Sequence, residues 1–287
     1  MDLLTALYIV PTPIGNMQDI TARAVNVLCG ADVICAEDTR HSLPLLENIG
    51  VKSPTLISFH DHNEAQKAEK IAELINEGKS VALISDAGTP LISDPGYHLV
   101  TECVSRNIKV IPLPGPCAAI TALCASGMPT DRFSFEGFLP VKAKALKDKL
   151  NSVVEDERTL IFYEAPRRMM DTAIVLGEVF GDRDVAIGRE LTKTFETFYY
   201  AKACDIAKVL ADDPNADKGE MVLIVAPFKK DKQDCEIPND AIKLLKILLT
   251  DMPVKKCCAV VSQMYDLKKN DLYSLALELN DSIASKI

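Results

Sequence analysis

The sequence lacks several features that mark whole classes of protein. It contains no tryptophan, and only 6% of its 287 residues are aromatic. No apolar run reaches the roughly 18 to 20 residues that a membrane-spanning helix needs. Prolines at positions 11 and 13 interrupt the first apolar run, and no basic segment precedes it, so we expect neither secretion nor membrane anchoring.

Basic residues are fewer than acidic ones. The chain has 32 Lys and Arg residues against 41 Asp and Glu residues, which gives a net charge of -9. This excess of acid excludes a protein that coats nucleic acid by bulk attraction to phosphates. Any RNA partner must therefore be met by a local basic surface.

Cysteine is present, but not in the spacing of a disulfide framework or a zinc site. The 9 cysteines are odd in number, and none belongs to a CxxC pair. Several lie within apolar runs, among them Cys35 and Cys103. This usage is typical of reduced, buried thiols, so we expect a cytoplasmic protein with no metal centre.

What remains is the composition of a folded protein, 48% apolar and 25% charged, with enough length for two domains. In the first half, helical patterns alternate with five short apolar runs, at 6–11, 33–36, 55–59, 81–85 and 108–113. Helices are predicted at 21–29, capped by Asp19 or Thr21, and at 63–77. This alternation predicts an α/β fold with a parallel sheet, whose ligands bind beyond the carboxyl ends of the strands.

Loops rich in glycine and proline follow three of these runs, at 11–16, 86–96 and 114–118. One such loop alone would be typical of an ordinary turn, but three at strand ends predict a ligand cleft. The first loop has no GxGxxG pattern, and its two prolines lack N–H groups, which disfavours a pyrophosphate cradle. Small side chains and free backbone groups suit a flat, zwitterionic, nucleoside-like ligand.

The second half predicts another α/β unit. The glycines and prolines of 126–140 mark a domain boundary, and a lysine-rich helix follows them. Strands are predicted at 159–163, 184–188, 194–200 and 221–226, with a helix at 168–180.

A polar linker at 229–240 precedes a short helical tail. The helices predicted there, at 255–265 and 270–279, could form a helix-turn-helix-like appendage. The predicted domains are therefore 1–125, 126–230 and 238–287.

Eight strings resemble the ribosomal RNA small subunit methyltransferase I family, a branch of the tetrapyrrole-methylase (class III) S-adenosylmethionine enzymes. They are PTPIGNMQDIT (11–21), AEDTRHS (36–42), HDHNE (60–64), LISDAGTPLISDPG (83–96), PLPGPCAAITAL (112–123), GMPTDRFSFEGFLP (127–140), FYEAPRR (162–168) and RELTKTFE (189–196). The resemblance runs from about residue 6 to 228 and continues at 252–279.

The resemblance implies two α/β domains with S-adenosylmethionine in the cleft between them, and a homodimer. It also implies methylation of the ribose 2′-hydroxyl of a cytidine in the decoding region of 16S rRNA, with rRNA or the 30S subunit as partner. The cofactor residues carried over by motif are Ile14, Gly15, Ala87, Gly88, Thr89, Ile92, Cys117, Ala118, Glu164 and Leu191.

Two departures from the wider tetrapyrrole-methylase pattern concern the substrate. The first loop lacks the usual glycine-rich, aspartate-ended form, and Thr89 replaces the Asp of a GGDP string. Both departures argue against a porphyrin or corrin substrate more strongly than they argue against methyl transfer. A methylase of tetrapyrroles or other small molecules, and a non-catalytic rRNA-binding factor, are the alternative functions.

Methyl transfer to a hydroxyl is helped by a general base. The candidates are Glu37, Asp38, His60, Asp86, Asp94, Glu164 and Glu190, of which Glu164 and Glu190 are preferred. The expected substrate-binding residues are Asp38, Arg40, His60, Arg167 and Lys193.

Other readings of these residues stay open. Asp38 could instead cap a helix with an acidic first turn. His60 and His62 flank Asp61, but two ligands without a third cluster favour a loop contact over a metal site. Cys117 could carry a lowered pKa at a helix start, although a small side chain beside the cofactor is the simpler interpretation.

Overall fold

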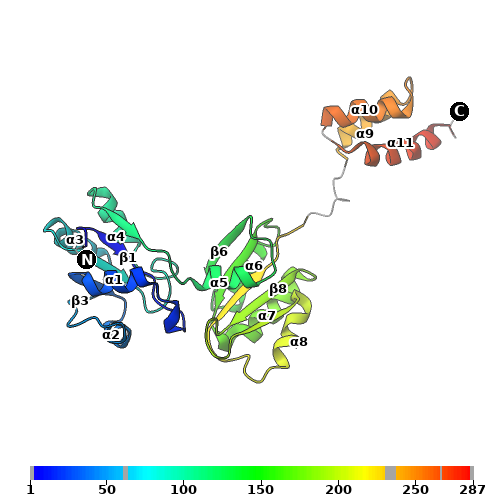
Figure 1. Ribbon diagram of the computed structural model, residues 1–287. Helices are drawn as coiled ribbons and strands as arrows, with labels where there is room; N and C mark the ends of the chain where they lie inside the picture. Colours follow the sequence, from blue (N-terminus) through cyan, green and yellow to red (C-terminus); the bar gives the residue numbers. More distant parts are fainter. Residues whose placement is uncertain (1–2, 61–63, 230–236, 266, 285–287) are drawn as a thin grey trace. The chain divides into compact units, whose positions relative to one another are not determined.

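In the computed structural model, five short parallel strands form the first sheet, in the order β3-β2-β4-β1-β5. Figure 1 shows β1 and β3 of this sheet among helices that neighbour them along the chain. The strands are β1 (Leu7–Ile9), β2 (Val33–Ala36), β3 (Leu56–Ser58), β4 (Val81–Ile84) and β5 (Val110–Pro112). The structure describes residues 3–60, 64–229, 237–265 and 267–284. The predicted parallel sheet is confirmed.

Helices cover both faces of this sheet. They are α1 (Ala22–Gly30), α2 (Thr39–Asn48), α3 (Glu64–Asn76) and α4 (Tyr97–Ser105), with a 3-10 turn η1 (Met17–Asp19) before α1. Successive strand residues point to opposite faces, so Tyr8 joins a core with α1 and α2, while Leu7 joins one with α3 and α4. Of the two predicted caps of α1, Thr21 is the one that accepts a hydrogen bond, from Ala24 N at 3.0 Å.

The second sheet is mixed, in the order β6-β7-β10-β8-β9. Its strands are β6 (Phe133–Phe138), β7 (Thr159–Glu164), β8 (Asp184–Arg189), β9 (Thr197–Lys202) and β10 (Met221–Val225). Only β6 and β7 pair in parallel among these neighbours. Four of the strands were predicted, whereas β6 falls in the segment read as a domain boundary.

Three helices pack on one face of the second sheet and one short helix packs on the other. α6 (Ala143–Ser152), α7 (Pro166–Phe180) and α8 (Ala203–Ala211) share one apolar core with it. The short α5 (Ala118–Ala125) packs on the other face. α7 begins at Pro166, before the predicted start at 168, because proline suits the first turn of a helix.

Residues 1–228 form one compact unit and residues 229–287 a second. The second unit contains α9 (Asn239–Leu248), α10 (Val254–Tyr265) and α11 (Lys269–Ala284) around a core of its own that includes Leu245, Val261 and Leu272. The predicted domain limits at 125, 230 and 238 stay predictions. No helix within the described ranges is long and apolar enough to cross a membrane.

A reciprocal polar contact joins the starts of β2 and β4. Asp32 Oδ2 accepts hydrogen bonds from Ser80 N at 2.8 Å and from Ser80 Oγ at 2.7 Å, and Asp32 N donates to Ser80 Oγ at 3.0 Å. The bond from Ser80 N is the largest of the causes that hold the pKa of Asp32 below its usual value. The contact therefore favours the ionised carboxylate in the folded state.

Replacing Asp32 with Asn should lower the free energy of unfolding at pH 7 by about 1 kcal/mol, because charge-assisted hydrogen bonds are lost at a half-exposed site. Since folding lowers this pKa, the stabilisation is complete above the unfolded value of about 4 and disappears as the pH falls through the folded value. Urea unfolding at pH 7 and at about pH 3 measures the effect.

The matched control is Asp184→Asn, which removes an exposed ion pair with Lys202. It should change stability by less than about 0.5 kcal/mol at either pH. An Asp32→Asn deficit that stays constant as the pH falls would contradict the role given to the carboxylate.

Candidate functional site

The three glycine- and proline-rich loops lie together at the carboxyl edge of the first sheet, as the sequence predicted. Thr12 N donates to Gly88 O at 2.8 Å, and Gly88 N donates to Thr12 O at 3.0 Å, which links the first loop (11–16) to the second (86–96). Thr89 Oγ1 donates to Pro116 O at 2.7 Å and links the second loop to the third (114–118).

Gly115 permits the third loop to touch the first. A Cβ atom at this position would lie 2.6 Å from Cβ of Pro11. Real Cβ atoms do not approach backbone-anchored carbons so closely, so any larger residue would push the two loops apart.

The second loop is strained, and a buried carboxyl group holds its far end. Leu91 and Ser93 have positive φ values of 75° and 67°, which non-glycine residues rarely adopt. Glu64, only 6% exposed, accepts hydrogen bonds from Gly96 N at 3.0 Å and from His98 N at 2.6 Å. The carboxylate thus fixes the end of the loop and satisfies amides at the start of α4.

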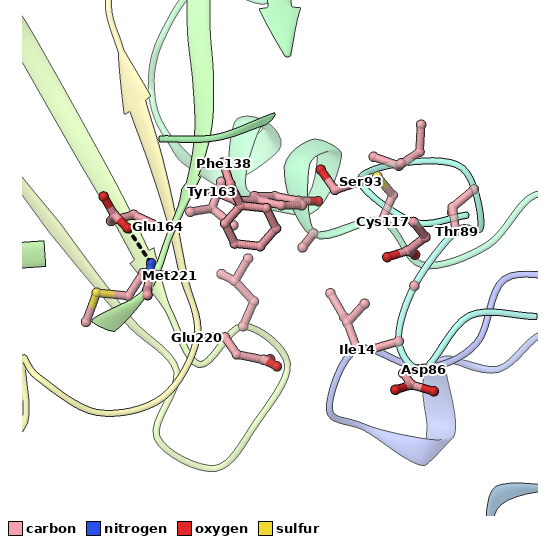
Figure 2. Close-up of a pocket in the computed structure, with 18 of the residues that line it drawn as sticks. Ile14, Asp86, Thr89, Ser93, Cys117, Phe138, Tyr163, Glu164, Glu220 and Met221 are labelled. Atoms are coloured by element: carbon pink, nitrogen blue, oxygen red, sulfur yellow. Dashed lines mark hydrogen bonds between the residues drawn. The ribbon is translucent and has the colours of Figure 1, made fainter. Parts of the chain in front are cut away.

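A cavity of about 420 Å³ opens between these loops and strand ends of the second sheet (Figure 2). Its volume falls within the range of small-molecule and cofactor sites. Of the ten predicted cofactor residues, nine line it, namely Ile14, Ala87, Gly88, Thr89, Ile92, Cys117, Ala118, Glu164 and Leu191.

Gly15 is the predicted cofactor residue that does not line the cavity. A Cβ atom there would overlap Cγ of Lys193 and lie 3.2 Å from Leu191 O. Glycine at this position therefore allows the first loop to pack against the loop that follows β8.

Carboxyl side chains are frequent in the cavity lining. They are Glu37, Asp86, Asp94, Glu164 and Glu220. Asp86 Oδ1 accepts a hydrogen bond from Asp38 N at 3.2 Å, and its other oxygen lies 3.7 Å from His41 Nδ1. A cavity with apolar walls and several carboxyl groups favours a ligand with a positive charge.

Glu164 is buried, and both of its oxygens accept hydrogen bonds. Oε2 accepts from Arg168 Nη2 at 2.9 Å and from Thr172 Oγ1 at 2.7 Å, and Oε1 accepts from Ala165 N at 2.7 Å. Figure 2 shows this side chain beside Met221 at the cavity wall. Three hydrogen bonds therefore hold the Glu164 carboxyl group in place at the cavity wall.

Glu190 is absent from the cavity lining as far as the chain is described. Its Oε1 accepts from Lys193 Nζ at 2.9 Å and from Glu220 N at 3.0 Å. Burial opposes its charge, but these bonds outweigh burial and keep the pKa of Glu190 below its usual value. Lys193 also pairs with Glu220 Oε2 at 3.0 Å, so the predicted substrate residue is engaged by two carboxylates.

None of the five predicted substrate residues, all of which the structure describes, lines the cavity. Asp38 caps α2 by accepting from Arg40 N at 2.9 Å, and the first turn of that helix holds no acidic residue. The Arg40 guanidinium, 90% exposed, donates to Asp38 and keeps the pKa of that carboxyl well below its usual range. Arg167 is exposed and borders a separate pocket of about 180 Å³.

His60 follows β3 and is not part of the cavity lining in the described chain. Its neighbours Asp61 and His62, considered above for a metal, lie outside the described residues. Among the residues that the structure describes, no group of three His, Cys, Asp or Glu side chains could hold a metal ion.

Sequence reasoning missed the cavity residues that lie in the second sheet or next to one of its strands, Phe138, Tyr163, Glu220, Met221 and Val222. Tyr163 OH accepts from Ala119 N at 3.2 Å, and burial raises the pKa of this phenol well above its usual value. Met221 pairs with Glu164 because β10 runs antiparallel to β7, so the start of β10 reaches the cavity. A residue at the start of a strand lies outside the pattern of loops that follow strand ends.

Residues 6–207 match the family model described as Tetrapyrrole (Corrin/Porphyrin) Methylases, and residues 236–280 match the one described as RsmI C-terminal HTH domain. The chain is 52% identical to the ribosomal RNA small subunit methyltransferase I of Haemophilus influenzae, over 96% of this chain and 98% of the relative. It is 50% identical to the protein of the same name from Escherichia coli O157:H7, over 95% and 94%.

Solved structures share the fold of the first unit. The methyltransferase CobJ matches with a TM-score of 0.57 and 18% identity, covering 77% of this chain and 94% of that one. Diphthine synthase matches with a TM-score of 0.57 and 12% identity, covering 77% and 89%. At such identities the likeness concerns the fold alone.

Replacing Gly115 with Ala should weaken binding of the S-adenosylmethionine that the sequence predicts by about tenfold, because the added methyl group forces the first and third loops apart. Isothermal titration calorimetry measures the affinity, and circular dichroism checks that the fold is retained.

The double variant Pro11→Gly/Gly115→Ala removes the ring that the methyl group meets. It should recover part of the lost affinity. Wild-type affinity in Gly115→Ala alone would show that contact between these loops does not shape the binding site.

Proposed function

The chain belongs to the tetrapyrrole (corrin/porphyrin) methylase family, and from this premise we propose that it transfers a methyl group from S-adenosylmethionine to small-subunit rRNA. The acceptor we propose is the ribose 2′-hydroxyl of a cytidine in the decoding region of 16S rRNA. Relatives named ribosomal RNA small subunit methyltransferase I, 50% and 52% identical over nearly the whole chain, support the choice of substrate.

The cavity is the observation that carries the proposal. When bound, S-adenosylmethionine supplies a methyl group on a positively charged sulfonium. The residues present fit such a molecule, because the volume is suitable, Ile14 and Leu191 offer apolar walls, and carboxyl groups such as Asp86 complement a cation. Gly88 and Ala118 line the cavity without bulky side chains, which lets a nucleoside approach the second and third loops closely.

The chain contributes to the reaction mainly by positioning. Transfer requires the acceptor oxygen to lie in line behind the methyl group, with water excluded. Glu164 and Glu190 stay proposals as general bases. Both carboxyl groups are paired with a cation, but Glu164 lines the cavity and Glu190 does not, so Glu164 is the better placed of the two to meet a hydroxyl group.

Incubation with labelled S-adenosylmethionine and undermodified 30S subunits should place the label in 16S rRNA, and mass spectrometry should locate it on a ribose. Subunits that already carry the modification serve as the control and should accept none. Binding of the cofactor in calorimetry with no transfer to RNA would instead support a non-catalytic factor, and transfer to a porphyrinoid would support a tetrapyrrole substrate.

We further propose a cytoplasmic protein whose helical unit contacts rRNA. The match of residues 236–280 to a helix-turn-helix model supports this, as do the exposed Lys255 and Lys256 at the start of α10. The eight cysteines within the described ranges are all free, which suits a reducing compartment.

The composition of α5 supports the proposed homodimer. Its sequence, AAITALCA, is apolar almost all round, and such helices are usually covered on every side. Ala119, Ala122 and Leu123 are buried against the second sheet, but Ile120 is 44% exposed. A second copy of the chain would cover the remaining face.

Replacing Ile120 with Asp should convert a wild-type dimer to monomers, because a charge would be buried without a partner in the interface. Sedimentation velocity measures the mass. The control is Ile174→Asp, which changes an apolar residue of α7 that is 53% exposed and should leave the dimer intact. A monomeric wild type, or a dimeric Ile120→Asp variant, would contradict this interface.

A further inference from the structure

Phe138 is a large apolar side chain that remains 64% exposed although it lines the cavity. It is the last residue of β6, and Figure 2 shows its ring beside that of Tyr163. Exposure of a phenylalanine forfeits hydrophobic stabilisation, so a ligand that covers this ring would gain free energy.

A bulge in β6 turns Phe138 toward the cavity. Phe135 pairs with Ile161 and Phe138 with Tyr163, so β6 advances three residues while β7 advances two. The extra residue is accommodated at Gly137, whose φ is 71°. In a regular strand, residues 135 and 138 would point to opposite faces, but the bulge puts both rings on Tyr163.

The ring contacts are edge-on. The centroids of Phe135 and Phe138 lie 4.8 Å and 5.4 Å from that of Tyr163, at interplanar angles of 67° and 69°. This T-shaped packing is a favourable arrangement of aromatic rings. It supports one edge of Phe138 and leaves most of its surface exposed.

The chain after Phe138 is held by an arginine. Arg168 Nη2 donates to Leu139 O at 3.0 Å and to Pro140 O at 2.9 Å, and it also donates to the buried Glu164. Arg168 and Thr172 both lie on α7 and donate to the same oxygen of Glu164, and this shared contact fixes the arginine. Phe138 is therefore presented on a rigid segment.

Charge at the cavity favours an uncharged contact with RNA. Glu37, Asp86 and Glu220 line the same cavity, and carboxylates repel phosphate groups. A nucleotide that enters must therefore gain affinity through its base. Single-stranded RNA bases are commonly recognised by stacking on aromatic side chains, and enzymes that modify nucleotides often draw the target out of its stack.

We propose that Phe138 is the platform on which the target base stacks while its ribose faces the methyl donor. This inference rests on the proposed function and specifies a residue that determines how the substrate binds. The ring acts on the nucleotide and not on the cofactor.

Replacing Phe138 with Ala should lower kcat/KM for undermodified 30S subunits by about 10- to 100-fold, the loss expected for one stacked base. The dissociation constant for S-adenosylmethionine should change by less than about twofold. Phe138→Trp should retain activity, because any aromatic face can stack. The matched control is Phe133→Ala, in the same strand but outside the cavity lining, which should behave as wild type.

A direct readout uses the absence of tryptophan from the chain. The Phe138→Trp variant carries a single indole, whose fluorescence should be quenched when a short RNA with the target sequence is added. Phe133→Trp should show no such quenching. Thermal unfolding should confirm that all four variants are folded.

The outcomes separate this inference from the proposed function. A wild type that transfers no methyl group to 30S subunits overturns the proposed function. An active wild type whose Phe138→Ala variant matches Phe133→Ala overturns the platform alone. A loss of cofactor affinity equal to the loss of kcat/KM would assign the ring to the cofactor site and overturn it as well.

Discussion

The contact among three loops at the carboxyl edge of the first sheet is the constraint on which the cavity depends. Parallel strands bring loops from distant parts of the chain to one edge, but only specific bonds close them into a wall. The paired amides of Thr12 and Gly88 and the hydroxyl of Thr89 supply those bonds. The loops are so closely packed that Gly115 has no room for a methyl group.

The sequence predicted this half of the site because each physical signal was local. Buried parallel strands are short uninterrupted apolar runs, and the loops after β1, β4 and β5 are unusual in glycine and proline. β6 escaped detection because its FSFEGF sequence has a glycine and a bulge near its end. Phe138 was therefore missed, and Met221 was missed because β10 reaches the cavity at its start.

Contacts between distant residues could not be read from the sequence. Glu64 lies in a string that drew attention for its histidines, yet its carboxylate serves the amides of Gly96 and His98, more than 30 residues away. Lys193, which stays a predicted substrate residue, pairs with Glu220, 27 residues further along the chain. Side-chain pairing is set by how the strands order in the sheet, which local patterns do not encode.

The charge of the cavity explains how an acidic chain can act on RNA under the proposed function. Carboxyl groups such as Asp86 favour a sulfonium and disfavour phosphate, so one set of residues serves the cofactor and discourages the RNA backbone. Attraction to phosphates must then come from outside the cavity, where Arg40 and Lys255 are exposed. Only the target nucleotide has to enter the acidic cavity, and an exposed aromatic ring offers it a contact that costs no charge repulsion.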